Sequence, residues 1–279
     1  MSSISNYYVD YFGPWALIAG ASEGIGAAFA EELASKGLNV VLIARSKDIL
    51  NKLAKKIEQQ YNVQVKIIIQ DLTANKMLDE ISKKTKNLEI GFLVVNAALS
   101  PIGLFHNATE ELHNKVIDLN CRAPMLLSYH FGKEMKKRGN GGIILISSLA
   151  GLQGNPIHTH YSATRGYVIN LAEGLWDEMK NFGVKVMVCQ AGPTKTPNWG
   201  RSTPKEPLSV RIIILEPKKV AQQAIRAIKR RRKPYFVPGF LNRLFSFFLQ
   251  HTTTRKQRVK LMGSVARKMY GEEKNYSNK

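Results

Sequence analysis

The sequence has 279 residues, of which 44% are apolar, 22% charged and 9% aromatic. This length suits one α/β domain or two small ones, and the ordinary composition excludes collagen-like, coiled-coil and wholly disordered chains. The net charge is +20, and residues 201–279 carry most of it, with 20 Lys/Arg against 4 Asp/Glu, a net of +16. The C-terminal quarter therefore either binds an anionic partner or forms a solvated basic surface.

The chain lacks the features of an exported or membrane-spanning protein. No apolar run approaches the roughly 18 residues that a spanning helix needs, and residues 1–10 lack the pattern of a secretory signal. Cys121 and Cys189 lie in apolar segments, which favours a reducing compartment. We expect a cytoplasmic protein, with a peripheral position at the inner membrane face as the alternative. No Cys/His cluster has metal-ligand spacing, so no metal is predicted.

Short apolar runs alternate with longer amphipathic segments from Trp15 to Gln190. The runs are rich in Val, Ile and Leu without strict alternation, which is typical of strands buried on both faces of a parallel sheet. We predict strands at 15–19, 39–44, 65–70, 91–95, 143–147 and 184–189, and helices near 24–36, 47–61, 75–85, 109–138 and 159–182. This order predicts an α/β fold with a Rossmann-type, doubly wound parallel sheet and right-handed crossovers.

The domain organisation follows from these elements. We predict an N-terminal extension at 1–14, one Rossmann-fold catalytic domain at 15–238, and a basic, amphipathic helical tail at 239–279 that lies at the periphery. Within the domain, residues 192–217 are rich in Pro, Thr and Ser and are expected to form a substrate loop. A helix at 217–231 and a last strand at 235–238 should follow.

A glycine-rich turn follows the first strand and opens the first helix, which is the context that dinucleotide binding requires. It contains Gly20, Ser22, Glu23, Gly24, Ile25 and Gly26. Gly20 allows a tight turn, Gly24 lets the backbone approach a pyrophosphate, and Gly26 lets the helix pack close to the strand. The helix N-terminus then offers free N–H groups to phosphate. A glycine-rich turn without a ligand is the alternative.

The spacing Gly-x-x-x-Gly-x-Gly resembles that of the short-chain dehydrogenase/reductase family, and further segments match that family in order. By this resemblance Asp71 and Leu72 would contact adenine, Asn96, Ala97 and Ala98 would line the cofactor site, and Gly192, Thr194 and Thr196 would form the nicotinamide loop. The resemblance covers about 15–200 closely. The segment Pro238-Gly239-Phe240-Leu241-Asn242-Arg243 looks like a bacterial branch of broad-specificity reductases.

The residues after the second strand predict the nucleotide. An NAD-selective site usually has a carboxylate there for the ribose 2′-hydroxyl, whereas this chain has Arg45, Ser46 and Lys47. Arg45 can pair with a 2′-phosphate through two hydrogen bonds. We therefore predict NADP(H) in preference to NAD(H), although the charge of Glu23 near the phosphates counts against it. Arg45 covering the strand end in solvent is the alternative.

The resemblance implies a catalytic set of Asn120, Ser148, Tyr161 and residue 165. Ser148 lies thirteen residues before Tyr161, as in the family, and would orient the substrate oxygen. Tyr161 would donate the proton, helped by a cation four residues later on the same helical face. The family has Lys there, and this chain has Arg165, which can hold the ribose but relays protons poorly.

The reaction implied is hydride transfer between a nicotinamide and a carbonyl or alcohol carbon of a small molecule. Trp199 and the Phe/Leu-rich tail suggest a lipophilic substrate. The alternatives are a nucleotide-binding protein with weak or no catalysis, because of Arg165, and a membrane-attached scaffold. His158 and His160 are expected to be surface residues, with the substrate mouth as their alternative place. By resemblance, helices 109–138 and 159–182 would form a homodimer or homotetramer interface.

The tail combines cations with an apolar helical face. Residues Phe240, Leu241, Leu244, Phe245 and Phe248 recur at helical spacing. The basic run 229–233 precedes them, and Arg255, Lys256, Arg258 and Lys260 follow. Such a helix suits the surface of an anionic membrane, and packing on the catalytic domain or on a second subunit is the alternative. Nucleic acid is not predicted as a partner, since a known binding motif is missing.

Overall fold

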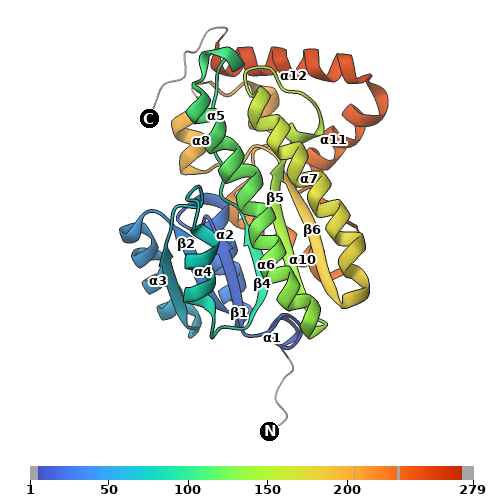
Figure 1. Cartoon of the computed structure of the whole chain (residues 1–279). Coiled ribbons are helices and arrows are strands. Elements are labelled where there is room, and N and C mark those ends of the chain that lie inside the picture. The colour runs from blue at the N-terminus through green and yellow to red at the C-terminus, as the bar shows by residue number, and fades with distance from the viewer. Residues whose placement is uncertain (1–5, 204, 231–232, 272–279) are drawn as a thin grey trace.

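A single sheet of seven parallel strands forms the centre of the protein. The computed structural model describes residues 6–203, 205–230 and 233–271 (Figure 1). The strands are β1 (Trp15–Ala19), β2 (Asn39–Ala44), β3 (Val65–Ile69), β4 (Ile90–Val95), β5 (Gly141–Ser148), β6 (Val184–Ala191) and β7 (Tyr235–Phe236), in the order β3-β2-β1-β4-β5-β6-β7. Every strand pair is parallel. The predicted doubly wound α/β fold is therefore confirmed.

Helices cover both faces of the sheet. Helices α2 (Gly24–Ala34), α3 (Lys47–Tyr61) and α10 (Pro217–Arg230) bury their apolar sides against one face. Helices α4 (Met77–Thr85), α6 (Ala123–Arg138) and α7 (Thr159–Met179) cover the other. The strand order reverses between β1 and β4, and ligands of such sheets bind beyond the carboxyl ends of the strands at that point.

The predicted long helix at 109–138 is interrupted in the middle. It consists of α5 (Glu110–Ile117), a π-helical turn at Asp118–Arg122, and α6. Pro124 lies at the start of α6 and has no N–H, so it cannot donate to the carbonyl of Asn120 four residues earlier. The carbonyl of Asn120 therefore lacks the donor that a regular α-helix would supply four residues later.

The region 192–217 is more ordered than a simple loop. It contains two short helices, α8 (Pro197–Ser202) and α9 (Leu208–Arg211). Thr196 caps α8, because its side chain accepts a hydrogen bond from the amide of Trp199. Short 3-10 turns at Phe105–Asn107, Leu149–Leu152 and Lys180–Phe182 complete the connections between the larger elements.

The first helix and the last two helices lie at opposite ends of the sheet (Figure 1). At the amino-terminal end, α1 (Tyr7–Phe12) buries Phe12 completely against Phe92, with ring centroids 4.7 Å apart. At the other end lie α11 (Phe240–Thr252) and α12 (Arg255–Tyr270). The tail is helical, as predicted, but α12 is not simply peripheral, since Ala266, Met269 and Tyr270 are buried.

Part of the predicted basic run 229–233, namely Arg231 and Arg232, lies outside the residues that the structure describes. No helix within the described ranges is long and apolar enough to cross a membrane.

Candidate active site

A cavity of about 470 Å³ opens at the carboxyl ends of β1, β4, β5 and β6. Nine of the residues predicted from the sequence line it: Ile25, Asn96, Ala98, Ser148, Tyr161, Arg165, Gly192, Thr194 and Thr196. They come from five separate parts of the chain, and the sheet brings them together. The volume of the cavity lies in the range of pockets that bind drug-sized ligands.

The glycine-rich turn leaves room along one side of this cavity. Gly24 has a φ of +60°, and a Cβ atom there would lie 2.8 Å from Thr196 Cγ2 in the facing loop. A Cβ atom on Gly26 would lie 2.0 Å from the carbonyl oxygen of Gly20. Larger residues at either position would therefore fill the gap between turn and loop or push α2 away from β1.

The first turn of α2 is open to a ligand. Glu23 occupies the N-cap position, and its side chain makes no capping hydrogen bond. Its carboxylate instead forms an ion pair with Arg201 of α8, across the mouth of the turn. The charge of Glu23, which counted against a phosphate, is thus paired with a cation, and Ser22 lies half-buried beside it.

The segment after β4 supports the turn from the other side. The side-chain amide of Asn96 donates to the carbonyl of Gly20 (2.8 Å), and the backbone amides of Asn96 and Ala97 both donate to Ala19. A Cβ atom on Gly20 would lie 2.5 Å from the amide nitrogen of Ala97. These contacts lock the glycine-rich turn to the carboxyl end of β4.

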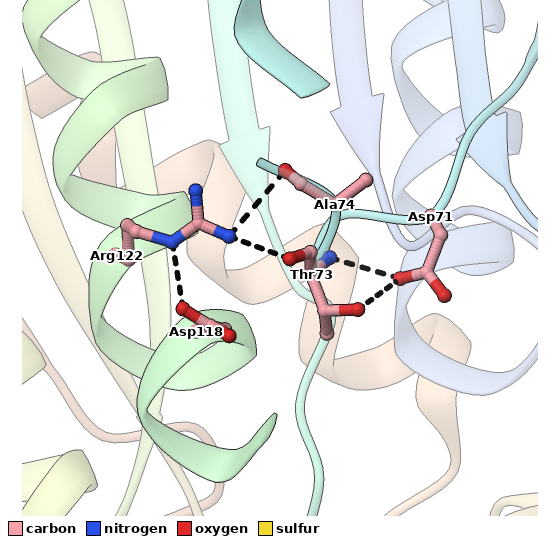
Figure 2. Close-up of polar contacts among 5 residues, drawn as sticks. All are labelled: Asp71, Thr73, Ala74, Asp118 and Arg122. Carbon is pink, nitrogen blue, oxygen red and sulfur yellow. Dashed lines mark hydrogen bonds and ion pairs between the residues drawn. The ribbon is translucent and has the colours of Figure 1, made fainter. Parts of the chain in front are cut away.

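The Asp71 segment is tied to the interrupted helix (Figure 2). Arg122, in the π-helical turn, pairs with Asp118 (2.7 Å) and donates to the carbonyls of Thr73 (2.6 Å) and Ala74 (3.4 Å). Asp71 accepts hydrogen bonds from the amide and hydroxyl of Thr73 (2.9 and 2.8 Å). These contacts fix the carboxylate next to the buried Leu72, the other member of the predicted adenine-contacting pair.

The Asp71 carboxyl group remains ionised at neutral pH. Partial burial raises its pKa, but the hydrogen bonds from Thr73 and the charges of Arg45 and Lys115 outweigh this, so the net pKa lies below the ordinary value of 3.8. Arg45 itself is exposed at the end of β2, and Ser46 precedes α3 with a side chain that makes no capping hydrogen bond. Both groups are therefore accessible from solvent.

Asn120 is buried and holds the centre of the site together. Its side chain accepts from the amide of Leu99 and donates to the carbonyl of Leu99 (both 2.8 Å) and to the hydroxyl of Thr164 (3.0 Å). The two bonds with Leu99 tie Asn120 to the loop after β4, and the bond to Thr164 ties it to α7. Its freed carbonyl accepts from Nη2 of Arg165 at 3.4 Å. The backbone link between Asn120 and residue 165 is therefore direct.

Arg165 lies beneath Tyr161 and points into the protein. It is 2% exposed, and it donates to the carbonyl of Ile146 at 3.2 Å as well as to Asn120. Its Cζ atom lies 5.3 Å from the centroid of the Tyr161 ring. Burial lowers the pKa of Arg165, whereas Tyr161 and Cys121 raise it. The guanidinium is thus a cation held by two carbonyls, and its Nε is buried without a partner among the described residues.

Ser148 and Tyr161 reach the same cavity from different elements. Ser148 ends β5 and caps the following turn, where its hydroxyl accepts from the amide of Ala150 at 3.2 Å. Tyr161 lies in the first turn of α7, one helical turn before Arg165. The neighbouring Ser147 donates to the backbone carbonyl of Arg165 at 2.8 Å. The strand end and the helix therefore hold a hydroxyl, a phenol and a cation at one surface.

The opposite wall of the cavity is apolar, and the tail supplies much of it. Trp199, Val210 and Ile213 come from the region 192–217, and Phe245 comes from α11. Helix α12 adds Leu261, Met262, Val265, Ala266, Met269 and Tyr270. Sequence reasoning missed this contribution, because α12 lies about a hundred residues after Tyr161 and carries no motif.

The two histidines before Tyr161 have different environments. The expectation of a surface position is wrong for His158, which lines the cavity and packs edge-on against Tyr270 with ring centroids 4.9 Å apart. Burial lowers the pKa of His158 to about 4, so the ring is neutral at pH 7. His160 bonds His113 instead, with their Nδ1 atoms 2.7 Å apart. The sequence held no signal for His158, since its burial depends on α12.

The half-buried His158 predicts a pH dependence of stability. An unfolded chain would bind a proton on this residue below about pH 6.5, whereas the folded chain binds it only near pH 4. The unfolded state therefore gains relative to the folded state as the pH falls through this range, by about 2 kcal/mol at pH 4.5. The free energy of unfolding, measured in urea, should fall between pH 7 and pH 4.5 by about 2 kcal/mol less in His158→Gln than in the parent. His106→Gln, at an exposed position, should keep the parental dependence, and an identical loss in all three proteins would contradict the assignment.

Comparison with known proteins identifies the family. The family model for short chain dehydrogenases matches residues 14–207. The chain belongs to the short-chain dehydrogenase family. It is 32% identical over 234 residues to a 7β-hydroxysteroid dehydrogenase of Clostridium sardiniense. The matched region covers 84% of this chain and 88% of that relative. The relatives are dehydrogenases and reductases, and the protein is an oxidoreductase.

Solved structures of short-chain dehydrogenases agree with the fold. A 7β-hydroxysteroid dehydrogenase structure superimposes with a TM-score of 0.86 at 26% identity and covers 91% of this chain and 98% of that one. A short-chain dehydrogenase from Sphingobium yanoikuyae in complex with NADPH gives a TM-score of 0.75 at 29% identity, over 89% and 95% of the two chains.

The short-chain dehydrogenase family binds NAD(P), and the residues of this site fit such a cofactor. The uncapped N–H groups of α2 and the space beside Gly24 suit a pyrophosphate. Ionised Asp71 and buried Leu72 stand where the adenine-contacting pair is predicted. No group of three or more His, Cys, Asp or Glu residues in the described part of the chain is arranged to hold a metal ion.

Proposed function

We propose that the protein is an NADP(H)-dependent oxidoreductase that transfers hydride between the nicotinamide and a carbonyl or hydroxyl group of a bulky lipophilic small molecule. The observation that carries this proposal is the cavity itself, in which Ser148 and Tyr161 face an apolar wall built by the substrate loop and α12, with Arg165 buried beneath Tyr161. The relative named for a hydroxysteroid supports the same substrate class. We therefore propose hydroxysteroids and ketosteroids as the first compounds to test.

The roles of the residues follow from their chemistry. When bound, the cofactor supplies or accepts the hydride. In the reducing direction, Ser148 would hydrogen-bond the carbonyl oxygen and fix its position. Tyr161 would donate its proton to that oxygen, and Arg165 beneath the ring would stabilise the phenolate that remains. Asn120 would position Arg165 through its backbone carbonyl.

The substrate proposal rests on the apolar surface of the cavity. A hydrocarbon skeleton would contact Trp199, Val265 and Met269, and a second polar group could bind near Asn155 and His158. The side-chain oxygen of Asn155 is buried without a partner among the described residues. Turnover can be tested by following NADPH oxidation with a panel of ketosteroids, aryl ketones, aldehydes and 3-oxoacyl thioesters. We expect the bulky ketones to be reduced fastest, and failure of the whole panel would contradict the proposal.

The proposed preference for NADP(H) depends on Arg45. This side chain is exposed, it has no ion-pair partner among the residues described, and its position at the end of β2 suits a 2′-phosphate. The relative solved with NADPH supports this choice. Because a charge-assisted hydrogen bond contributes about 1.5–3 kcal/mol, Arg45→Asp should weaken NADPH binding at least about tenfold and leave NADH binding nearly unchanged. Lys55→Asp, an equal charge change at an exposed site on α3, serves as control. Equal affinity of the parent for both cofactors would refute the preference.

Two further proposals concern assembly and location. We propose a homodimer or homotetramer formed through α6 and α7, because these helices expose the large side chains of Met125, Tyr129 and Tyr167. Light scattering of the purified chain measures this mass directly. We also propose a cytoplasmic location, which agrees with the free, buried thiols of Cys121 and Cys189. Burial raises the pKa of the Cys189 thiol to about 12, so that thiol is unreactive.

A further inference from the structure

A second, larger cavity of about 910 Å³ lies between α7, α10, β7 and α11, away from Ser148 and Tyr161. We call it the basic groove, because five cations line it: Arg226, Arg230, Lys233, Arg243 and Arg255. None of them is ion-paired with a carboxylate of the described chain. Glu173 is the one acidic residue in its lining, and burial raises the pKa of that carboxyl.

The chain segment that supplies all five cations contributes no acidic residue to neutralise them. Residues 217–271 include 15 Lys/Arg and not one Asp or Glu. The positive potential of this surface is therefore not balanced locally, and it would attract an anion. Aromatic side chains of Phe236 and Phe247 lie among the cations, so the groove can also contact an apolar part of the same partner.

Helix α11 carries an exposed apolar stripe beside the groove. Phe240 is 70% exposed and Phe248 is 52% exposed, and Leu241 and Leu244 are also exposed. Residues 241, 244 and 248 follow one side of the helix, whereas Arg243 and Phe247 on the adjacent side line the groove. Phe245, although also partly exposed, lines the active-site cavity. The stripe therefore lies between the openings of the groove and of the active site.

We propose that α11 and the basic groove together form a docking surface for an anionic lipid bilayer. The stripe Leu241, Leu244 and Phe248 enters the bilayer surface, and the groove binds the phosphate of a lipid headgroup. A bilayer offers negative charge above an apolar layer, which complements both features. A second copy of the chain would bring the same unpaired cations face to face. Docking in this orientation places the opening of the active-site cavity, near Phe245, against the bilayer, from which a lipophilic substrate could enter.

The test is co-sedimentation of the full chain with vesicles of phosphatidylcholine alone or mixed with phosphatidylglycerol. The parent should co-sediment with the mixed vesicles at low salt and dissociate from them at high salt, because exposed charges are screened. It should not co-sediment with the neutral vesicles. Arg226→Gln with Arg243→Gln should weaken binding by about fivefold for each charge removed. Phe248→Ser should weaken it by about tenfold, because an apolar ring no longer enters the bilayer.

Matched variants separate docking from general charge and from folding. Lys52→Gln with Lys55→Gln removes two cations of α3, and Leu208→Ser removes an exposed apolar side chain of α9. Both should bind vesicles like the parent, and every variant should keep the parental circular dichroism and NADPH affinity. The proposal is overturned if the parent ignores anionic vesicles at low salt, or if the groove and stripe variants bind as well as these controls. It is also overturned if the groove variants instead dissociate an oligomer in light scattering, since the surface would then be a subunit interface.

Discussion

Replacing Tyr161 with Phe is expected to lower kcat by about 10²–10⁴-fold, the usual contribution of a general acid. The substitution removes only the hydroxyl, so the ring keeps its place in the cavity and above Arg165, 5.3 Å from the guanidinium carbon. NADPH affinity, measured by fluorescence titration, should change by no more than a few-fold.

The Ser148→Ala variant separates proton donation from substrate orientation. Ser148 caps its own turn through the amide of Ala150, so its loss should lower kcat with a smaller effect than Tyr161→Phe and little change in NADPH binding. Robust turnover by the Tyr161→Phe variant would show that another group donates the proton, and the catalytic assignment would be wrong.

Arg165→Met should have the second largest effect, because it removes a buried charge and two hydrogen bonds. The Arg165 Cζ atom lies 5.3 Å from the centroid of the Tyr161 ring, and a unit charge at about that distance from a developing negative charge is worth about 3 kcal/mol at an effective dielectric constant near 20, so kcat should fall about 10²-fold. The carbonyls of Ile146 and Asn120 would lose their donor, which costs about 1–3 kcal/mol of stability. Thermal unfolding and stopped-flow kinetics measure the two effects separately.

Arg165→Lys is the informative companion to this variant. It keeps the cation, although an ammonium cannot span both carbonyls as the planar guanidinium does. Some stability should be lost, while turnover should match or exceed that of the parent, because Lys can pass a proton and Arg cannot. Parental turnover in Arg165→Met would show that the cation has no role in the reaction.

The sequence predicted the sheet well because its signals are local. The strand at 39–44 and the helix at 47–61 match β2 and α3 to the residue, since apolar runs and amphipathic periods are read within the segment itself. The break at Asp118–Arg122 was missed, although Pro124 was the signal that could have located it. A proline inside a predicted helix removes one donor, and here that freed carbonyl receives Arg165.

Features that depend on distant parts of the chain were beyond local reasoning. The helical spacing of Tyr161 and Arg165 predicted that both share a face, but not that Arg165 would bond the carbonyls of Ile146 and Asn120. The burial of His158 depends on Tyr270, more than a hundred residues later. Likewise, the apolar pattern of the tail did not reveal that α12 lines the cavity while α11 keeps an exposed apolar stripe.

The central claim is hydride transfer at the Tyr161 site, and isotope transfer tests it most directly. NADPH carrying deuterium at both positions of the reactive nicotinamide carbon is incubated with the parent and a bulky ketone from the panel, and the alcohol is analysed by mass spectrometry. The account predicts one deuterium in each product molecule with the parent, and almost no product with Tyr161→Phe. Reduction of the ketone without deuterium, or no NADPH-dependent reduction of any ketone by the parent, would contradict it.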